Sequence, residues 1–280
     1  LALPLLLPLL APPVVRPAEG RFELVAADVG QGSALLVRTA RHLLVFDAGP
    51  RWSPEADAGE RVLVPLLRAR GERRIDVLML SHRDGDHVGG ASALLAALPV
   101  GELIGSLPDA HPLLGRVPHR RCAAGQRWRW DGVDFEVLHP PPGLAIADAA
   151  ANATSCVLRV QGAGASVLLP GDLPAAQEAA LVAAGAPLAA EVLVVPHHGS
   201  RSSSSEAFIT AVAPRWAVVQ AGYLNRFGHP APEVAARYAA RGITLLRSDR
   251  CGAWTLPAEG EPFCQRDVAR RYWHHLLPAR

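Results

Sequence analysis

Short apolar runs alternate with glycine turns and longer helical segments along the chain after Glu19. Runs of about four to eight apolar residues that end in turn signals are typical of buried strands. They predict strands at residues 22–30, 33–39, 42–49, 75–81, 155–160, 166–172, 191–199, 216–222, 244–248 and 252–257. Segments with helical composition predict helices at residues 61–71, 88–99, 173–185, 203–213 and 231–242.

The strongest local signal is a hairpin. Residues 127–138, RWRWDGVDFEVL, alternate in polarity about Asp131 and Gly132, a pair typical of two-residue turns. The alternation turns Trp128 and Trp130 toward a core and the arginines toward solvent. Arginines beside aromatic rings also suit a nucleic-acid track. Between His111 and Trp130 there are five arginines and no acids: Arg116, Arg120, Arg121, Arg127 and Arg129.

The order of the elements indicates an α/β fold. Strands cluster first and then alternate with helices, which implies layered sheets with helices over both outer faces. With 280 residues, half of them hydrophobic, the chain can bury a full core and is not a wholly disordered protein. The net charge of +2 is too small to indicate nucleic-acid binding by itself.

The two ends of the chain differ in composition from the middle. Residues 1–15, LALPLLLPLLAPPVV, are as apolar as a membrane segment, but a spanning helix needs about 20 apolar residues and prolines interrupt this stretch. We expect residues 1–20 to be the end of a membrane segment that lies mostly upstream, or else a proline-rich linker. Residues 257–280 are expected to form a tail with the composition of a basic amphipathic helix.

The four cysteines lack the C-x-x-C spacing of a structural zinc site. Cys251 and Cys264 can form a disulfide bond if the chain faces an oxidising compartment. Free buried thiols are at least as good an interpretation.

Potential metal ligands are concentrated in residues 81–90, SHRDGDHVGG. Close spacing lets one turn between a strand and a helix direct several ligands to one or two ions, and imidazoles with carboxylates suit zinc, manganese or iron. A polar turn with helix-capping aspartates would explain any one of these residues, but hardly all four: His82, Asp84, Asp86 and His87.

Three further polar groups follow apolar strands, where open α/β sheets place their sites. Asp172 ends LLPGD and could also be an ordinary helix cap. His197 and His198 follow VVP, and adjacent histidines point in different directions, so usually only one binds a given ion. Asp47 in FDAGP suits a role behind the ligands or against substrate. Serines 202 to 205 could present a helix start to a phosphate or form a solvated loop.

Taken in this order, the motifs resemble the metallo-β-lactamase superfamily, whose loop motif reads H-x-H-x-D-H. The match runs from about residue 22 to residue 256. The resemblance implies a four-layer αββα sandwich over residues 21–256, with a two-metal site at one edge of the sheets.

More specifically, the chain resembles the lactamase-like domain of ComEC-type DNA-uptake proteins of competent bacteria. The segments that carry this resemblance are DVGQG (28–32), SHRDGDHVGG, NATSCVL (152–158), PHHGSRSSS and NRFGHP (225–230). It implies a metal-dependent nuclease that degrades the DNA strand not transported through the channel. It also implies a place at the bacterial inner membrane, with the domain on the extracytoplasmic side and the channel portion of the same protein as partner. Ser33 departs from the aspartate usual in that family.

The resemblance also assigns the site residues. The ligands of two ions, with Asp172 bridging, are His82, Asp84 and Asp172 for one, and Asp86, His87, Asp172 and His198 for the other. The catalytic residues are Asp86, His197 and His229, the two histidines for phosphate contact or protonation of the leaving oxygen. The residues behind the ligands or against substrate are Asp28, Gln31, Asp47, Asn152, Ser155 and Ser200.

Asp84 stands where the best-known form of the motif has a histidine, so it adds negative charge and a hard oxygen ligand. Asn152 or Ser155 offers only a neutral oxygen where a further histidine is expected. We therefore expect two divalent ions, Mn²⁺ before Zn²⁺ or Mg²⁺. The alternatives are a hydrolase of small esters, thioesters or lactones, which Asp84 disfavours, and a catalytically silent DNA-binding module, which Ser33 and the missing histidine support.

Overall fold

The computed structural model describes residues 15–272 and residue 274. The apolar opening of the chain lies almost wholly outside these residues, so its expected membrane role stays a prediction. Within the described part, no helix combines the length and the apolar composition needed to cross a bilayer.

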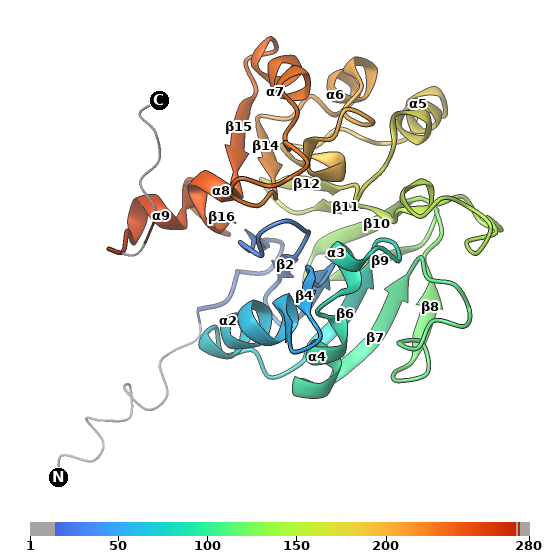
Figure 1. Cartoon of the computed structure of the whole chain (residues 1–280), viewed down its shortest axis with the longest axis vertical. Coiled ribbons are helices and arrows are strands. Elements are labelled where there is room, and N and C mark those ends of the chain that lie inside the picture. Colours follow the sequence, from blue (N-terminus) through green and yellow to red (C-terminus); the bar gives the residue numbers. More distant parts are fainter. Residues whose placement is uncertain (1–14, 273, 275–280) are drawn as a thin grey trace.

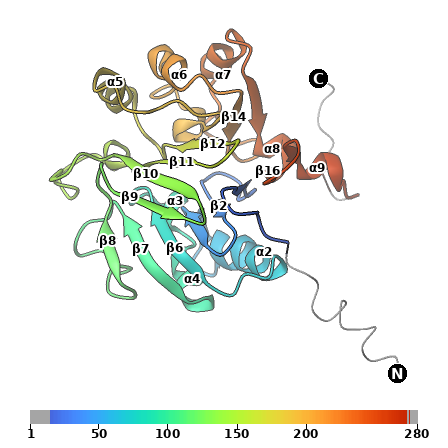
Figure 2. The same cartoon turned by 180° about the vertical axis from the view of Figure 1, so that it is seen from behind.

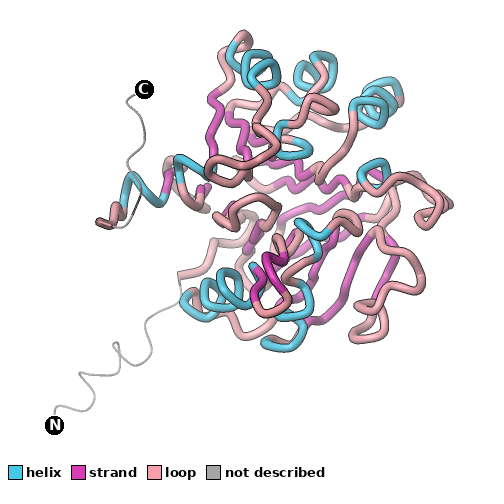
Figure 3. The backbone as a smooth tube through the Cα atoms, in the orientation of Figure 1, coloured by secondary structure: helices cyan, strands magenta, loops and turns pink. Residues whose placement is uncertain are grey.

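Two mixed sheets form the centre of the molecule (Figure 3). The first has eight strands in the order β17-β16-β1-β2-β3-β6-β7-β8. Their bounds are β1 Glu23–Ala26, β2 Leu35–Arg38, β3 Leu43–Phe46, β6 Ile75–Leu80, β7 Val100–Gly105, β8 His119–Arg121, β16 Trp254–Leu256 and β17 Phe263–Cys264. A separate two-stranded hairpin consists of β4 Arg51–Ser53 and β5 Ala56–Asp57.

The second sheet has seven strands in the order β15-β14-β13-β12-β11-β10-β9. Their bounds are β9 Arg127–Trp130, β10 Val133–His139, β11 Val157–Gln161, β12 Ser166–Leu169, β13 Val192–Val194, β14 Trp216–Val219 and β15 Thr244–Arg247. The helical elements are η2 Gly59–Leu63, α2 Val64–Ala69, α3 Gly85–Val88, α4 Ala91–Ala97, η3 Asn152–Thr154, α5 Ala175–Ala183, η4 Pro196–Gly199, α6 Glu206–Val212, α7 Pro232–Ala239, α8 Ser248–Cys251 and α9 Gln265–Val268.

Three hydrophobic cores hold these elements in layers. One core lies between the two sheets, a second between the first sheet and helices α2 and α4, and a third between the second sheet and helices α5 to α7. Because alternate residues of a strand point to opposite faces, β3 places Leu44 in the inner core and Val45 in an outer one. Figures 1 and 2 show α5 to α7 over one outer face and α2 and α4 over the other. The predicted four-layer αββα sandwich is confirmed.

The single helix predicted at residues 88–99 is wrong. The chain instead forms α3 and α4, separated by Gly89 and Gly90. A Cβ atom added at Gly89 would collide with the backbone nitrogen of Arg51. The glycines therefore let the segment after β3 pack against the turn that carries the candidate ligands.

The predicted hairpin at residues 127–138 is confirmed. Strands β9 and β10 pair antiparallel about Asp131 and Gly132, whose φ angles of 49° and 78° match the turn type that this pair favours. Trp128 and Trp130 pack against the inner core. Four of the arginines pair with acids, which favours the structural interpretation over a nucleic-acid track: Arg120 with Glu102, Arg121 with Asp109, Arg127 with Glu136 and Arg129 with Asp134.

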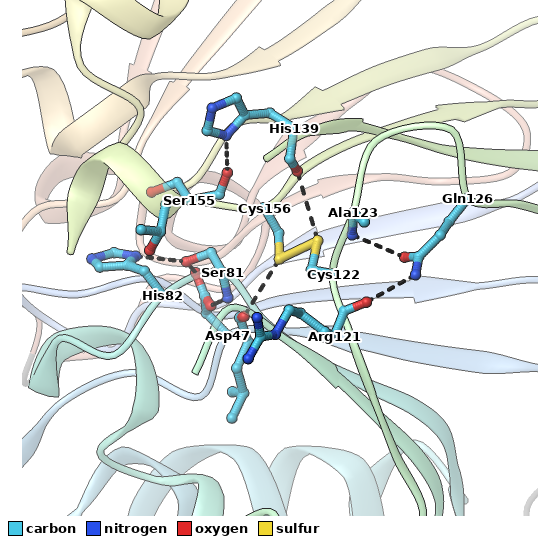
Figure 4. The surroundings of a disulfide bond; sticks show 12 residues. Asp47, Ser81, His82, Arg121, Cys122, Ala123, Gln126, His139, Ser155 and Cys156 are labelled. Carbon is cyan, nitrogen blue, oxygen red and sulfur yellow. Dashed lines mark hydrogen bonds between the residues drawn. A yellow bond between two sulfur atoms is a disulfide. The ribbon is translucent and has the colours of Figure 1, made fainter. Parts of the chain in front are cut away.

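The stretch expected as a tail contributes to the sheet. Strand β17 lies within residues 257–280, pairs antiparallel with β16, and holds Cys264 in a disulfide bond with Cys251. Cys122 and Cys156 form a second disulfide bond, close behind Ser81 and Ser155 (Figure 4). Of the two alternatives that the sequence leaves open, the Cys251–Cys264 bond is the one that forms, and no cysteine among the described residues is a free thiol.

Candidate metal centre

Loops from both sheets meet at one end of the sandwich. In the first sheet β3 and β6 run parallel, so Asp47, just after β3, lies beside Ser81, just after β6. In the second sheet β12 and β13 run parallel, which brings Asp172 near His197 and His198. The carboxyl ends of neighbouring parallel strands share an edge, and this common edge assembles the predicted residues.

Three histidines direct the same ring nitrogen into this space. The Nε2 atoms of His82, His87 and His198 are buried and have no hydrogen-bond partner within residues 15–272 and 274. The Nδ1 atom of His198 donates to the backbone carbonyl of Gln220 at 2.8 Å, and that of His87 to the carboxylate of Asp47 at 2.7 Å. Because these oxygens can only accept, each neutral imidazole keeps its lone pair on Nε2. A buried, unshared lone pair fits a metal ion.

Asp47 lies behind the histidines and orients them. It is fully buried, and it accepts hydrogen bonds from the backbone nitrogen of Ser81 at 2.7 Å, the Ser81 hydroxyl at 2.9 Å and His87. Since the hydroxyl donates to Asp47, it can accept from Nδ1 of His82, 3.0 Å away (Figure 4). Ser81 is not among the predicted site residues, although its place between a buried strand and His82 is a usable signal.

The carboxylate of Asp172 lies at the centre of the site. Its Oδ1 atom is 3.0 Å from Nε2 of His87 and 3.7 Å from Nε2 of His198. Burial raises the pKa of Asp172, but the two imidazoles outweigh burial and hold that pKa well below its usual value. Burial likewise lowers the pKa of His87, but Asp172 and Asp47 raise it well above the ordinary value. The pocket therefore favours a positive charge beside Asp172.

The two other acids of the motif lie nearer to solvent. Asp86 is 3.3 Å from Nε2 of His198, with 34% of its side chain exposed. Asp84 is 3.5 Å from Nε2 of His82, and 45% of its side chain is exposed. Both carboxylates thus approach, from the solvent side of the pocket, ring nitrogens that form no hydrogen bond within the described residues.

Two groups of donor atoms could each hold an ion. They are His82, His87 and Asp172, and Asp86, His87 and His198, with the atoms of each group within 4.8 Å of one another. Imidazole and carboxylate donors in this mixture fit zinc, manganese or iron. His87 is common to both groups, and Asp84 belongs to neither. The Nε2 atom of His87 has one lone pair and can bind only one ion, whereas the two oxygens of Asp172 can bind one ion each. The geometry is therefore compatible with Asp172 as the bridge between two ions, which stays a prediction.

The backbone at the site adopts left-handed conformations that are rare outside glycine. The φ angles are 60° at Asp47, 52° at His197 and 53° at His198. Such residues cost on the order of 1–3 kcal/mol each, and they cluster at functional sites. The two successive left-handed residues make the histidine rings diverge at 68°. His198 points toward Asp172 and His197 toward Ser202, and the assignment of His198 as the ligand stays a prediction.

His197 and His229 lie beside the donor groups. Nδ1 of His197 is 2.9 Å from the Ser202 hydroxyl, and its Nε2 is 3.3 Å from the amide nitrogen of Asn152 and 3.6 Å from Asp172. The ring of His229 is 5.9 Å from that of His197. Burial is the main cause that lowers both pKa values, that of His229 to about 4. Both rings are therefore placed to act as neutral hydrogen-bonding groups near pH 7.

The serines of the site hold its backbone. The Ser155 hydroxyl accepts from the backbone nitrogen of Asp172 at 3.2 Å, and the Ser200 hydroxyl lies 3.1 Å from that of Ser202. Ser205 caps α6. Of serines 202 to 205, Ser202 is therefore the one that reaches the histidines.

Asp28 and Gln31 support the loops around the site rather than the donor groups. Asp28 accepts from the backbone nitrogen of Gly30 at 3.3 Å and pairs with Arg266 at 3.3 Å. The side-chain oxygen of Gln31 accepts from the backbone nitrogen of Gly222 at 3.2 Å. Their predicted roles toward substrate stay predictions.

Gln220 supports the site but is not among the residues predicted for it. Its buried amide accepts from the Ser33 hydroxyl and the Ala34 nitrogen and donates to the carbonyls of Ala27 and Ala34. Its own carbonyl accepts from His198. Gln220 therefore ties the two sheets together where His198 is held, and Ser33 takes part in this support. A glutamine inside the apolar run WAVVQAG was the signal.

Comparisons with known proteins agree with this fold. The family model of the metallo-beta-lactamase superfamily matches residues 27–222. The chain is similar to competence protein ComA of Neisseria gonorrhoeae, with 45% identity over 236 residues, and to ComE operon protein 3 of Bacillus subtilis, with 32% identity over 257 residues. Each match covers 84% of this chain and 32% of the relative. The chain thus spans about a third of the length of these relatives.

Solved structures show the same fold. A metallo hydrolase of the archaeon Ignicoccus hospitalis matches with a TM-score of 0.56 and 12% sequence identity, covering 85% of this chain and 100% of that one. At this identity the likeness concerns the fold alone.

Proposed function

Because this chain belongs to the metallo-β-lactamase superfamily, we propose that its metal centre hydrolyses phosphodiester bonds of DNA with two divalent ions. The donor set carries this proposal. Three imidazole nitrogens that form no hydrogen bond within the described residues face three carboxylates, those of Asp84, Asp86 and Asp172. Oxygen-rich sites suit Mn²⁺ and Mg²⁺, and Mg²⁺ is commonly bound through carboxylates together with substrate phosphates.

The residues of the site have separable roles. The ions would be held by His82, Asp84, Asp86, His87, Asp172 and His198. When bound, two such ions stabilise the attacking and the leaving oxygen of an in-line displacement. Asp47 and Ser81 keep the imidazoles in the tautomer that presents Nε2. Asp86, partly exposed, can accept a hydrogen bond from the attacking water.

The groups that would contact substrate lie around His197, next to Asp172. Nε2 of His197 lies 3.6 Å from the Asp172 carboxylate, and the amide nitrogen of Asn152 lies 3.3 Å from the same ring nitrogen, so the two side chains could together hold a phosphoryl oxygen. The ring of His229 lies 5.9 Å from that of His197 and, as a neutral imidazole, would donate a hydrogen bond to a phosphate or leaving oxygen.

The similarity to competence proteins supports a role in DNA uptake. We propose that the strand cleaved is the one not transported, and that the channel portion of a longer protein is the partner. The proposed place is the extracytoplasmic side of the bacterial inner membrane, which the two disulfide bonds support. Protease treatment of spheroplasts tests the side, since complete protection by an intact membrane contradicts it.

A metal series with labelled DNA tests the activity. The purified chain is stripped of metal and given Mn²⁺, Mg²⁺ or Zn²⁺ at matched occupancy, with a thioester substrate as a parallel assay. We expect DNA cleavage with Mn²⁺ to exceed that with Zn²⁺, and Asp84→His to shift the preference toward Zn²⁺. Equal wild-type activity with zinc contradicts the assigned role of Asp84. Metal binding without DNA cleavage contradicts the nuclease and favours a silent DNA-binding module.

A further inference from the structure

The loop between β14 and α7, residues 222–230, carries exposed apolar side chains next to the metal centre. Seven large hydrophobic side chains are exposed in the described part of the chain, and three of them lie in this loop: Tyr223, Leu224 and Phe227. Phe227 is 54% exposed. Apolar surface gathered in one place marks an interaction site more often than scattered apolar residues do.

A series of aromatic rings joins Phe227 to the metal centre. The ring of Phe227 lies 5.6 Å from that of His229, with only 22° between their planes. His229 in turn lies 6.3 Å from His198, again nearly parallel at 24°. The exposed ring is therefore two ring contacts from a candidate ligand, beside the place where a scissile phosphate would be held.

Hydrogen bonds hold this loop in one conformation. The amide nitrogen of Asn225 donates to the carbonyls of Gly222 at 3.0 Å and His229 at 2.7 Å, and its oxygen accepts from the backbone nitrogen of His229 at 2.9 Å. Gln31 ties Gly222 to the first sheet. An aromatic ring on a loop ordered in this way can bind a ligand with little further loss of conformational entropy.

Arg226 adds positive charge at the same place. Its guanidinium carbon lies 4.8 Å from the centroid of the Phe227 ring. Within residues 15–272 and 274, no carboxylate forms an ion pair with Arg226, in contrast to the paired arginines of β8 and β9. An exposed ring with an unpaired guanidinium is the combination with which proteins bind single-stranded nucleic acid, through base stacking and phosphate contact.

We propose that Phe227 and Arg226 bind an unpaired nucleobase of DNA adjacent to the scissile phosphate, an inference that rests on the proposed nuclease function. A base inside a duplex is already stacked on its neighbours, and unstacking it costs a few kcal/mol. The site therefore selects single-stranded or frayed DNA over intact duplex.

Binding of dye-labelled oligonucleotides in EDTA, followed by fluorescence anisotropy, tests the proposal without relying on cleavage. We expect Phe227→Ala to weaken binding of single-stranded DNA by about 5- to 100-fold, the range of one lost base stack. Phe227→Trp should keep wild-type affinity. Val268→Ala is the control, because it removes an exposed apolar side chain outside this loop that has no aromatic face, and it should change affinity less than about twofold.

Oligonucleotides with one abasic site, moved along the strand, identify the contact. In the wild type, one abasic position should weaken binding about as much as Phe227→Ala does, and in Phe227→Ala that position should no longer matter. Equal affinity of wild type and Phe227→Ala, or unchanged sensitivity to the abasic site in the variant, overturns the proposal. Cleavage is measured separately with Mn²⁺. Its absence contradicts the nuclease function, whereas the stacking contact is decided by the binding data.

Discussion

Asp47 and Asp131 lie against opposite ends of strand β3 and are built alike. Asp47 follows the strand, and Asp131 binds His42, the residue before it. Both are buried aspartates with left-handed backbones, at φ angles of 60° and 49°. Each carboxylate accepts hydrogen bonds from backbone and side-chain donors. The two sites differ in whether the side chains that donate to the carboxylate have a buried ring nitrogen left without a hydrogen bond within the described residues.

At Asp131 the hydrogen-bond network is closed, which means that protein groups alone complete it. Its oxygens accept from the Thr39 hydroxyl at 2.6 Å, the Arg41 nitrogen at 2.7 Å and Nδ1 of His42 at 3.0 Å, which joins two turns of different sheets. At Asp47 the donors lead to the imidazoles of His82 and His87, whose Nε2 atoms lack a hydrogen-bond partner among the described residues. A closed polar network stabilises the fold, whereas an open one is completed by a ligand.

The largest effect is expected from removing the centre of the open network. Asp172→Ala should abolish DNA cleavage and weaken both metal sites, because both assigned groups of ligands use this carboxylate. His198→Ala should empty one site and leave the other loaded. His197→Ala should retain metal and lose at most the ~10²–10⁴-fold of a proton-transfer group. Metal titration of the three variants measures this order. An empty site in His197→Ala beside a fully loaded His198→Ala would show that the two histidines are assigned the wrong way round.

A substitution in the closed network at Asp131 should lower stability and leave metal binding unchanged. Asp131→Asn replaces an oxygen that accepts three hydrogen bonds by an NH₂ group, so the free energy of unfolding should fall by about 3 kcal/mol, or roughly 100-fold in the equilibrium constant. Metal content and cleavage should not change. Urea unfolding measures the loss, and Asp134→Asn, an exposed acid on the neighbouring strand, is the control with an expected change within about 0.5 kcal/mol. If Asp131→Asn lost metal without losing stability, the distinction between a structural network at Asp131 and a metal-supporting network at Asp47 would be contradicted.

Asp47→Asn should lower metal affinity by ~10–100-fold, the usual range for a group that orients a ligating histidine. The amide can no longer accept from both Ser81 and His87, so the imidazole is less firmly held. Isothermal titration with Mn²⁺ measures the affinity, and urea unfolding of the metal-free protein measures stability. We expect a smaller stability loss than in Asp131→Asn. If the two variants lose stability equally while Mn²⁺ binding is unchanged, Asp47 is a structural residue like Asp131.

The smallest effect is expected from lowering the pH, which should reduce the stability difference between wild type and Asp131→Asn. Burial raises the pKa of Asp131, but hydrogen bonds from Thr39, His42 and Arg41 outweigh burial and hold that pKa well below its usual value. A carboxylate with a lowered pKa in the folded state stabilises the protein above its unfolded pKa of about 3.9, and this contribution is lost as the pH falls. The stability gap between wild type and Asp131→Asn should therefore narrow below about pH 4, in urea unfolding with EDTA. A gap that is the same at pH 7 and at pH 3.5 contradicts this account.

Elements that depend on neighbouring residues could be predicted from the sequence. The β9–β10 hairpin and the polar turn from His82 to His87 follow from local periodicity and spacing. Strands β7 and β8 could not. β7 contains Gly101, Glu102 and Gly105, residue types depleted in strands, and β8 is three exposed polar residues. Both become strands because β6 and then β7 offer them a parallel edge.

By itself, the sequence determined the layered class of the fold, the turn that carries the first four candidate ligands, and the residues Asp172 and His198 that join them. Only the tertiary structure decided which atoms meet: that Asp172 lies against His87, that Asp84 stays at the rim, and that Gln220 bonds to Ser33, 187 residues away. The physical reason is the distance along the chain over which each effect acts. Periodicity and turn chemistry act over a few residues, whereas the rotation of a ring or the partner of a buried amide depends on how two whole sheets pack.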